Sequence, residues 1–242
     1  FLPTESIGKI ISTNFQKIIL IFALIISMLN FYLLFNIFNK KILIKSHKED
    51  LYLIVLAGIF ILLIYFNKFD LLDIILSVAS SLSNSGLTLL KNENNLSLYF
   101  LFLTIIGGSL ISNSSGIKLS RFYILLKITS AEIIRLISPN SVINKTIFNS
   151  ENKITDDNIK ISFLIFISFF LSLFILSSFL ILDNIGFERS FKLSILALTN
   201  TVNSEMYNLQ NLSFANLLIS SKISLIIFMI IGKIELISIF LI

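Results

Sequence analysis

Cysteine is absent from this sequence of 242 residues, and histidine occurs once, as His47. The chain therefore has no thiol nucleophile and no disulfide, and a single histidine excludes nearly all zinc and haem chemistry. The HExxH and GxSxG motifs of common hydrolases are missing too. The sequence also lacks the paired aspartates of intramembrane proteases, and the serines between residues 109 and 115 have no nearby base. We therefore expect no catalytic residues and no enzyme activity.

Charge is scarce as well. Charged residues make up 14% of the chain, against about 25% in soluble domains, and hydrophobic residues make up 55%. This composition predicts an integral membrane protein. No basic start with a small-residue cleavage site marks a signal peptide. Because the first residue is Phe1 rather than Met and the last apolar run stops at Ile242, we expect a fragment, cut at the N-terminus and by a few residues at the C-terminus.

The net charge of +5 suggests a nucleic acid partner, but the positions of the basic residues argue against one. Two connections hold eleven of them: Lys40, Lys41, Lys45, Lys48, Lys118, Arg121, Lys127, Arg135, Lys145, Lys153 and Lys160. The connections on the opposite side hold four: Lys68, Lys91, Arg189 and Lys192. This asymmetry is the positive-inside pattern of membrane proteins. We expect a multi-pass protein of the cell inner membrane, with loops 39–50 and 118–158 in the cytoplasm and no nucleic acid partner.

Long apolar runs define the expected helical spans, because a helix needs about 20 apolar residues to cross a bilayer. Such runs cover residues 18–38, 51–66, 159–182 and 212–242. Two further runs, residues 71–82 and 190–202, are too short to cross. Each alone is equally consistent with an interfacial or an ordinary packed helix. The order of span, half-length helix, polar turn and span occurs twice, at 51–127 and 159–242, which favours half-helices that enter the membrane and stop inside it.

One expected span, residues 96–127, is interrupted near its middle. Its apolar run is broken by glycine and polar residues, namely Gly107, Gly108, Ser112, Asn113, Ser114, Ser115 and Gly116. Non-helical backbone at membrane depth is tolerated where protein buries it or where it lines a watery cavity, and transport proteins place it around an ion or substrate path. A half-helix that stops at mid-membrane directs its negative C-terminal end at the centre, which favours a cation there. After the first half-helix, Gly86 lets the turn adopt a positive φ at no steric cost.

Three sequence blocks resemble the Trk/Ktr/HKT superfamily of potassium transporters, and within it the TrkH branch. The first block is Ile106-Gly107-Gly108-Ser109 with Ser115-Gly116-Ile117-Lys118 and Arg121. The second is EIIRLISPNSV at 132–142, and the third is GKIE at 232–235. The resemblance covers essentially the whole chain and implies an all-α membrane protein with repeated span–pore-helix–span units around a central ion pore. Its parts would be the end of the second unit with its span and cytoplasmic loop (1–50), the third unit (51–128), a cytoplasmic connection (129–158) and the fourth unit (159–242).

The resemblance also implies a site. Potassium, or alternatively sodium, would bind the backbone carbonyls of two filter turns, which are Ser83, Asn84, Ser85 and Gly86 in the third unit and Asn200, Thr201, Val202 and Asn203 in the fourth. Asn203 stands where the family has glycine, and Asn is the next residue to tolerate a left-handed backbone. The broken span would be the gating loop, stiffened by Ser114 and Ser115 in place of glycines. No cofactor is implied; the implied partners are the lipid bilayer, a second copy in a homodimer and a cytoplasmic nucleotide-binding regulatory subunit.

The sequence leaves two interpretations open for Lys233, for the pair Asp70 and Asp73, and for the function of the protein. Lys233 lies either midway along the last span, where the resemblance gives it a role in pore electrostatics, or at the cytoplasmic edge of a span that ends at residue 231. Asp70 and Asp73 open the first half-helix and either complement its dipole, which we favour, or bind ions. The alternative to potassium uptake is a degenerate or structural membrane subunit without transport activity, an interpretation that Asn203 and the truncated start support.

Overall fold

The computed structural model describes residues 11, 13–38, 47–90, 96–138, 146–149, 153–203, 205–209 and 217–240. Within these ranges the regular structure is helical, and one isolated bridge, between Thr146 and Lys153, is the single strand-like pairing. Of the basic residues used to orient the chain, Lys40, Lys41, Lys45, Lys91 and Lys145 lie outside the described residues.

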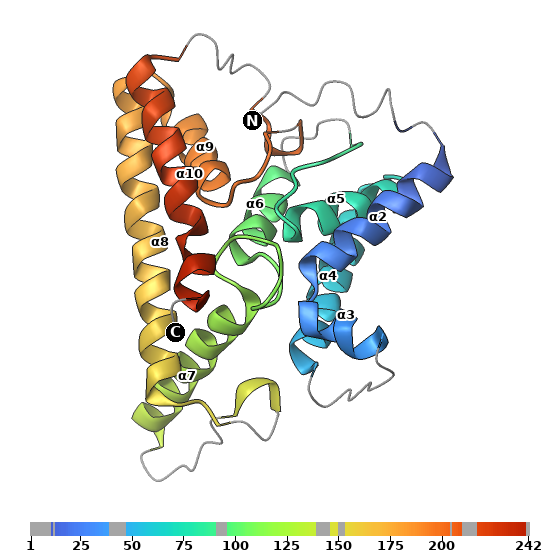
Figure 1. Ribbon diagram of the computed structural model, residues 1–242, viewed down its shortest axis with the longest axis vertical. Helices are drawn as coiled ribbons and strands as arrows, with labels where there is room; N and C mark the ends of the chain where they lie inside the picture. The colour runs from blue at the N-terminus through green and yellow to red at the C-terminus, as the bar shows by residue number, and fades with distance from the viewer. Residues whose placement is uncertain are drawn as a thin grey trace.

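The helices follow one another in a repeating order of long and short elements. In chain order they are α2 (Asn14–Met28), α3 (Phe31–Phe38), α4 (Lys48–Tyr65), α5 (Leu71–Leu82), α6 (Ser97–Ile106), α7 (Leu119–Ile137), the 3-10 turn η3 (Ile147–Asn149), α8 (Asp156–Leu182), α9 (Phe187–Leu198), the 3-10 turn η4 (Glu205–Tyr207) and α10 (Ile219–Phe240). Figure 1 shows α8 and α10 side by side along one edge, with α9 packed against both. On the opposite edge α2 packs against α5, and α6 lies between the two groups.

Two short helices stand where the sequence predicts half-helices. Helix α5 has the predicted bounds, and α9 begins and ends a few residues before the predicted run; each is 12 residues long. Most residues of both helices are buried, including nearly all of their C-terminal halves. This burial excludes helices that lie on a membrane surface, and it places both C-terminal ends inside the protein.

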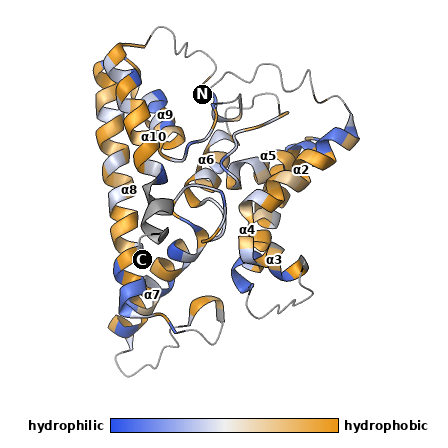
Figure 2. Cartoon of the chain, in the orientation of Figure 1, coloured by the Kyte–Doolittle hydropathy of each residue, from blue (hydrophilic) through white to orange (hydrophobic). Residues whose placement is uncertain are grey.

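Helix α8 is the one described helix that is long and apolar enough to cross a membrane by itself, with 27 residues. It begins at Thr155, whose side chain accepts the backbone N–H of Asn158 and caps the helix. Apolar side chains cover its outer surface, and Figure 2 shows the same apolar character along much of α4 and α10. A helix that exposes large apolar residues to this extent is typical of a lipid-facing position.

The predicted span at 18–38 is not one continuous helix. Helices α2 and α3 together have the length and apolarity of a span, but they are bent by 108° at residues 29–30. The bend contains neither glycine nor proline, but the side chain of Asn30 accepts the N–H of Tyr32 (2.9 Å) and caps the start of α3. Tertiary hydrogen bonds hold it, because the N–H of Asn30 donates to Asp50 Oδ1 (2.9 Å) and the N–H of Phe31 donates to the carbonyl of Ile111 (2.8 Å).

The predicted interruption of the span at residues 96–127 is confirmed, since α6 ends at Ile106 and α7 begins at Leu119. Helix α7 then continues to Ile137, past the predicted end of the span at residue 127. Its added turns are mostly exposed and carry a Glu132–Arg135 ion pair at 3.1 Å, a spacing that supports a solvated helix. The break of this span therefore lies inside the protein, and the C-terminal end of α7 is exposed.

Candidate ion filter and gating loop

The predicted filter turn at residues 83–86 follows directly on the C-terminal end of α5. After α5 the N–H of Asn84 donates to the carbonyl of Ser81 (3.2 Å), and the N–H of Ser85 donates to the carbonyl of Ser80 (3.0 Å). This pair of bonds is the Schellman motif, which needs a left-handed residue at its centre. Asn84 fills that position with φ +58°. The chain therefore leaves the half-helix in a tight turn at the helix C-terminal end.

The fourth unit builds the same turn. After α9 the N–H of Asn200 donates to the carbonyl of Ala197 (3.1 Å), and the N–H of Thr201 donates to the carbonyl of Leu196 (2.9 Å). Asn200 has φ +53°. The hydroxyls repeat as well, because Ser83 Oγ and Ser85 Oγ are 3.2 Å apart and the matching pair, Thr199 Oγ1 and Thr201 Oγ1, is 2.7 Å apart. The two turns are equivalent, residue by residue.

This equivalence gives Gly86 a counterpart other than Asn203, which the family resemblance places at the glycine position. Counted from the left-handed Asn of each turn, the partner of Gly86 is Val202, and Asn203 lies one residue further on. Asn203 does not take a left-handed backbone; among described residues 199–203 that conformation belongs to Asn200. The asparagine of this turn that adopts a positive φ is therefore Asn200, three residues before Asn203.

The two filter turns meet at Gly86 and Val202. Gly86 has φ +74°, and a Cβ added to it would lie 2.1 Å from the carbonyl oxygen of Val202. No L-residue side chain fits at that separation, and few adopt that φ. Backbone from two half-helices thus converges at one point in the protein, and the turns are bordered by buried hydroxyls such as those of Ser80 and Ser81.

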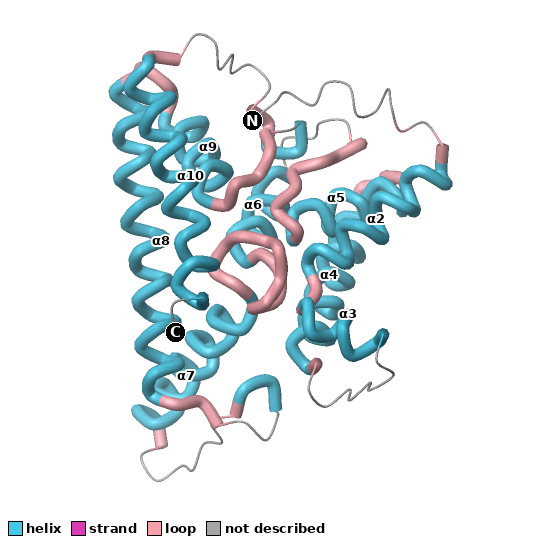
Figure 3. The backbone as a smooth tube through the Cα atoms, in the orientation of Figure 1, coloured by secondary structure: helices cyan, strands magenta, loops and turns pink. Residues whose placement is uncertain are grey.

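The broken span folds into a compact loop at residues 107–118, drawn as the ring-shaped segment at the centre of Figure 3. Because α6 stops at Ile106, its last carbonyls lack helical partners. Two of them are taken by the returning end of the loop, where the N–H groups of Ile117 and Lys118 donate to the carbonyls of Ile105 and Ile106, both at 2.9 Å. Gly107 (φ +70°) and Gly116 (φ +91°) sit where the two ends of the loop pass each other.

Lys118 holds the loop from inside, a role the sequence did not predict. Its side chain is buried, and its ammonium group lies among four oxygens of the loop itself. Lys118 Nζ donates to Ser112 Oγ (3.1 Å), Ser114 Oγ (3.2 Å), the carbonyl of Ser112 (3.4 Å) and the carbonyl of Ser114. Ser114 Oγ also accepts the N–H of Gly108 (2.8 Å). Ser114, one of the two serines that stand where the family has glycines, therefore binds the Lys118 ammonium group together with Ser112.

The loop is also held from outside, by the bend between α2 and α3. The N–H groups of Ser109 and Asn113 donate to the carbonyls of Met28 (3.0 Å) and Ser27 (3.2 Å), which the end of α2 leaves free. At the tip of the loop, the N–H of Leu110 donates to Glu49 Oε1 at 2.7 Å. The bend and the loop thus satisfy each other's backbone groups, as non-helical backbone in an apolar setting requires.

Charged side chains surround the loop. Lys118 and Arg121 are buried beside it, and Glu49 acts electrostatically on both. Lys233 is exposed on α10 and close enough to Lys118 for the two positive charges to interact. Its neighbour Gly232 packs on the end of α9, since a Cβ there would lie 1.9 Å from the carbonyl oxygen of Leu198. That contact places Gly232, the residue before Lys233, beside the C-terminal end of α9.

The two aspartates that open α5 play different parts. Asp70 occupies the N-cap position, but its side chain makes no capping hydrogen bond, so its stabilisation of the helix is limited to the favourable interaction with the dipole. Asp73 forms an ion pair with Lys17 of α2 at 2.6 Å. This pair joins the half-helix to the preceding unit.

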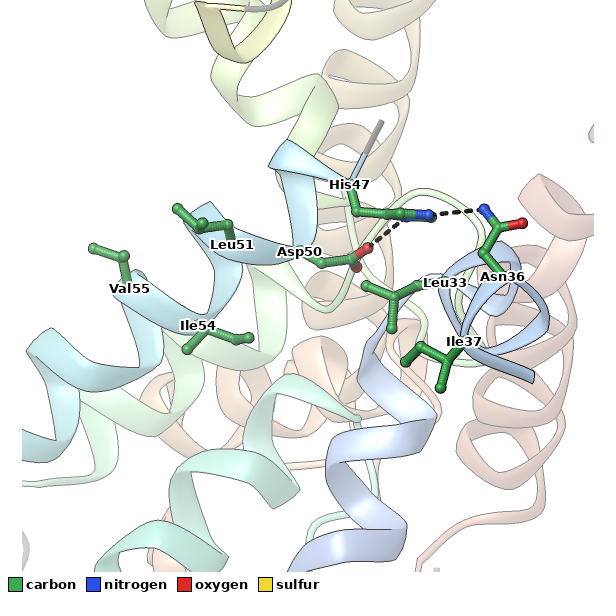
Figure 4. Close-up of a pocket in the computed structure, with 8 residues that line it drawn as sticks. All are labelled: Leu33, Asn36, Ile37, His47, Asp50, Leu51, Ile54 and Val55. Atoms are coloured by element: carbon green, nitrogen blue, oxygen red, sulfur yellow. Dashed lines mark hydrogen bonds and ion pairs between the residues drawn. The ribbon is translucent and has the colours of Figure 1, made fainter. Parts of the chain in front are cut away.

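A cavity of about 410 Å³ lies between α3 and α4, away from the filter turns. Figure 4 shows its lining residues, which are Leu33, Asn36, Ile37, His47, Asp50, Leu51, Ile54 and Val55. At its polar end Asn36 Nδ2 and His47 Nε2 are 3.0 Å apart, and His47 Nδ1 lies 3.5 Å from Asp50 Oδ2. Asp50 also accepts the N–H of Asn30 at the α2–α3 bend. The polar end of this cavity therefore stabilises the bend that holds the loop at residues 107–118.

Comparison with known proteins finds similarity to a curated cation transporter and to solved structures, among them a potassium transporter. No family model matches the chain. An uncharacterized cation transporter from Methanocaldococcus jannaschii is 31% identical over 112 residues, which is 43% of this chain and 24% of that protein. The crystal structure of the potassium transporter TrkH from Vibrio parahaemolyticus matches with a TM-score of 0.82 and 19% identity, over 95% of this chain and 52% of the TrkH chain. The chain thus spans about half of the solved protein and a smaller part of the curated one. The described residues have the all-helical fold of the TrkH chain.

Proposed function

We propose that the full-length protein takes up a monovalent cation, potassium in the first place, across the cytoplasmic membrane. The observation that carries the proposal is the convergence of two equivalent turns, at Gly86 and Val202, each at the C-terminal end of a buried half-helix. Helix C-termini carry partial negative charge and leave carbonyls without partners, so they favour a cation. The likeness in fold to a potassium transporter supports the same function.

In this proposal a cation sheds water onto carbonyls of the filter turns, and other units of the full-length protein complete the ring. Replacement of the hydration shell by backbone carbonyls is how potassium filters select their ion. No side chain chemistry is needed, so the protein acts without catalytic residues or a cofactor. The choice between potassium and sodium depends on the spacing of these carbonyls.

The loop at residues 107–118 is proposed as the gate. Its support is its dense packing, with Lys118 inside, Glu49 at the tip and the α2–α3 bend on one flank. Two discrete packings of such a segment can open and close a path. We further propose a homodimer in the inner membrane and a cytoplasmic nucleotide-binding subunit that regulates this gate from the side of the basic connections.

The proposed function is tested by growth. A bacterium that lacks its potassium uptake systems is transformed with the full-length gene and grown at low external potassium. Growth restored by the wild-type gene, and not by a vector without it, is the expected result. Failure to grow, with the protein present in the membrane at normal levels, would favour a structural subunit without transport activity.

Orientation gives a separate prediction, made in a full-length protein free of other cysteines. Arg135→Cys, on the basic side, should resist an impermeant thiol reagent added to intact cells, and Arg189→Cys, at the start of α9, should react. Both positions are exposed, so access to the side chain is not limited by packing. Labelling of Arg135→Cys from outside would reverse the topology and place both half-helices on the cytoplasmic side.

A further inference from the structure

We infer that Asn84 and Asn200 determine selectivity as tethers, because their side-chain amides tie each filter turn to the membrane helix that follows it. The inference rests on the proposed function and assigns these residues a role through their side chains, in addition to any role of their carbonyls. The tether in the third unit also connects the filter to the gating loop.

The first tether joins α5 to α6. Asn84 is buried, and its Nδ2 donates to the carbonyl of Thr104 (2.9 Å) and lies 3.4 Å from Thr201 Oγ1 in the other filter turn. The atom that faces Thr104 must be the amide nitrogen, because a carbonyl oxygen accepts and cannot donate. One side chain therefore contacts both filter turns and the following helix.

The second tether repeats the first. Asn200 Nδ2 donates to the carbonyl of Met229 in α10, also at 2.9 Å. The accepting residues occupy matching places, Thr104 in Thr-Ile-Ile-Gly at 104–107 and Met229 in Met-Ile-Ile-Gly at 229–232. The two contacts share the residue type, its backbone conformation, the donor atom and the position of the acceptor. Such a repeat is not expected of an incidental contact.

The third-unit tether shares its helix turn with the gate. The carbonyls in the last turn of α6 accept hydrogen bonds from two segments, the filter turn and the end of the loop. The carbonyl of Thr104 binds Asn84, whereas those of Ile105 and Ile106 bind the N–H groups of Ile117 and Lys118 at the end of the loop. A displacement of the filter turn therefore moves the same turn of helix that anchors the loop. Filter geometry and loop packing are coupled through Asn84.

The experiment removes the donor in two ways in the full-length protein. Asn84→Asp keeps the shape of the side chain but replaces the amide donor by an acceptor, and Asn84→Gly keeps the left-handed backbone without introducing a charge. The matched controls are Asn184→Asp and Asn184→Gly, since Asn184 has the same backbone conformation (φ +60°) in the turn after α8, away from the filter. Potassium and sodium fluxes are measured separately in proteoliposomes.

Both Asn84 variants should lower the potassium-to-sodium flux ratio about tenfold, the scale of losing one buried hydrogen bond. Both Asn184 variants should keep the wild-type ratio. Asn200→Asp should lower the ratio as well, since the same contact is lost in the fourth unit. An unchanged ratio in both Asn84 variants would overturn the inference.

A second measurement does not depend on transport. In hydrogen–deuterium exchange, peptides that cover residues 105–118 should exchange faster in Asn84→Asp and Asn84→Gly than in wild type, whereas peptides from α8 should not change. If wild type carries no cation, the proposed function fails while this exchange difference still supports the tether. Exchange at the wild-type rate in residues 105–118 of both variants would refute the coupling even in an active transporter.

Discussion

Gly86→Val should reduce rubidium uptake to the background of cells without the transporter. A left-handed backbone at a non-glycine residue costs of order 1–3 kcal/mol and is worst for a β-branched side chain. The added Cβ would also lie 2.1 Å from the Val202 carbonyl oxygen, so one filter turn must move away from the other. Uptake is measured in cells with equal amounts of protein in the membrane.

Gly58→Val is the matched control for this change. Gly58 lies within α4, and a Cβ added there meets nothing within 4 Å. The same substitution should therefore leave uptake close to wild type, because valine also has a helix propensity no lower than that of glycine. If Gly86→Val transports rubidium at the wild-type rate, the filter assignment is wrong.

Lys118→Met should raise cation flux and weaken its regulation. Methionine has similar length but donates no hydrogen bond, so the carbonyls and hydroxyls of Ser112 and Ser114 lose the ammonium group they surround. A buried polar group without a partner costs about 1–3 kcal/mol, enough to shift a closed loop toward an open one about tenfold. The measurement is flux in proteoliposomes at a fixed potassium gradient.

Lys127→Met provides the comparison, because Lys127 lies on α7 beyond the loop, with Nζ 5.6 Å from the ring centre of Tyr123. It should keep the wild-type flux. Ser112→Ala/Ser114→Ala removes the hydroxyls around Lys118 and should raise flux in the same direction as Lys118→Met. A Lys118→Met protein with higher thermal stability and unchanged flux would mean that the loop is a structural kink and not a gate.

Much of this fold is predictable because its signals are local. The bounds of α5 follow from an apolar run that ends in Ser83 and Asn84, and the break before α7 follows from the density of glycine and serine after Ile106. Such residues favour turns over helix wherever they stand in the chain. Local composition therefore located both half-helices and the interrupted span.

The parts that the sequence did not predict depend on contacts between distant residues. Besides the cap that Asn30 forms at α3, the bend is held by Asp50 and by the carbonyl of Ile111, both of which lie far away in the sequence. Lys118 stood in a recognised motif, but its place among the serine oxygens follows from how the loop closes. The equivalence of Gly86 and Val202 follows from the hydrogen bonds that end α5 and α9, which the sequence alone does not show.

We propose that a cation binds where the two filter turns converge. Crystals of the full-length protein grown in rubidium allow this to be seen directly, since rubidium scatters anomalously and replaces potassium. We expect an anomalous peak among the backbone carbonyls of residues 83–86 and 200–203, and loss of that peak in Gly86→Val. A map in which rubidium occupies other sites and leaves these turns empty would contradict the account.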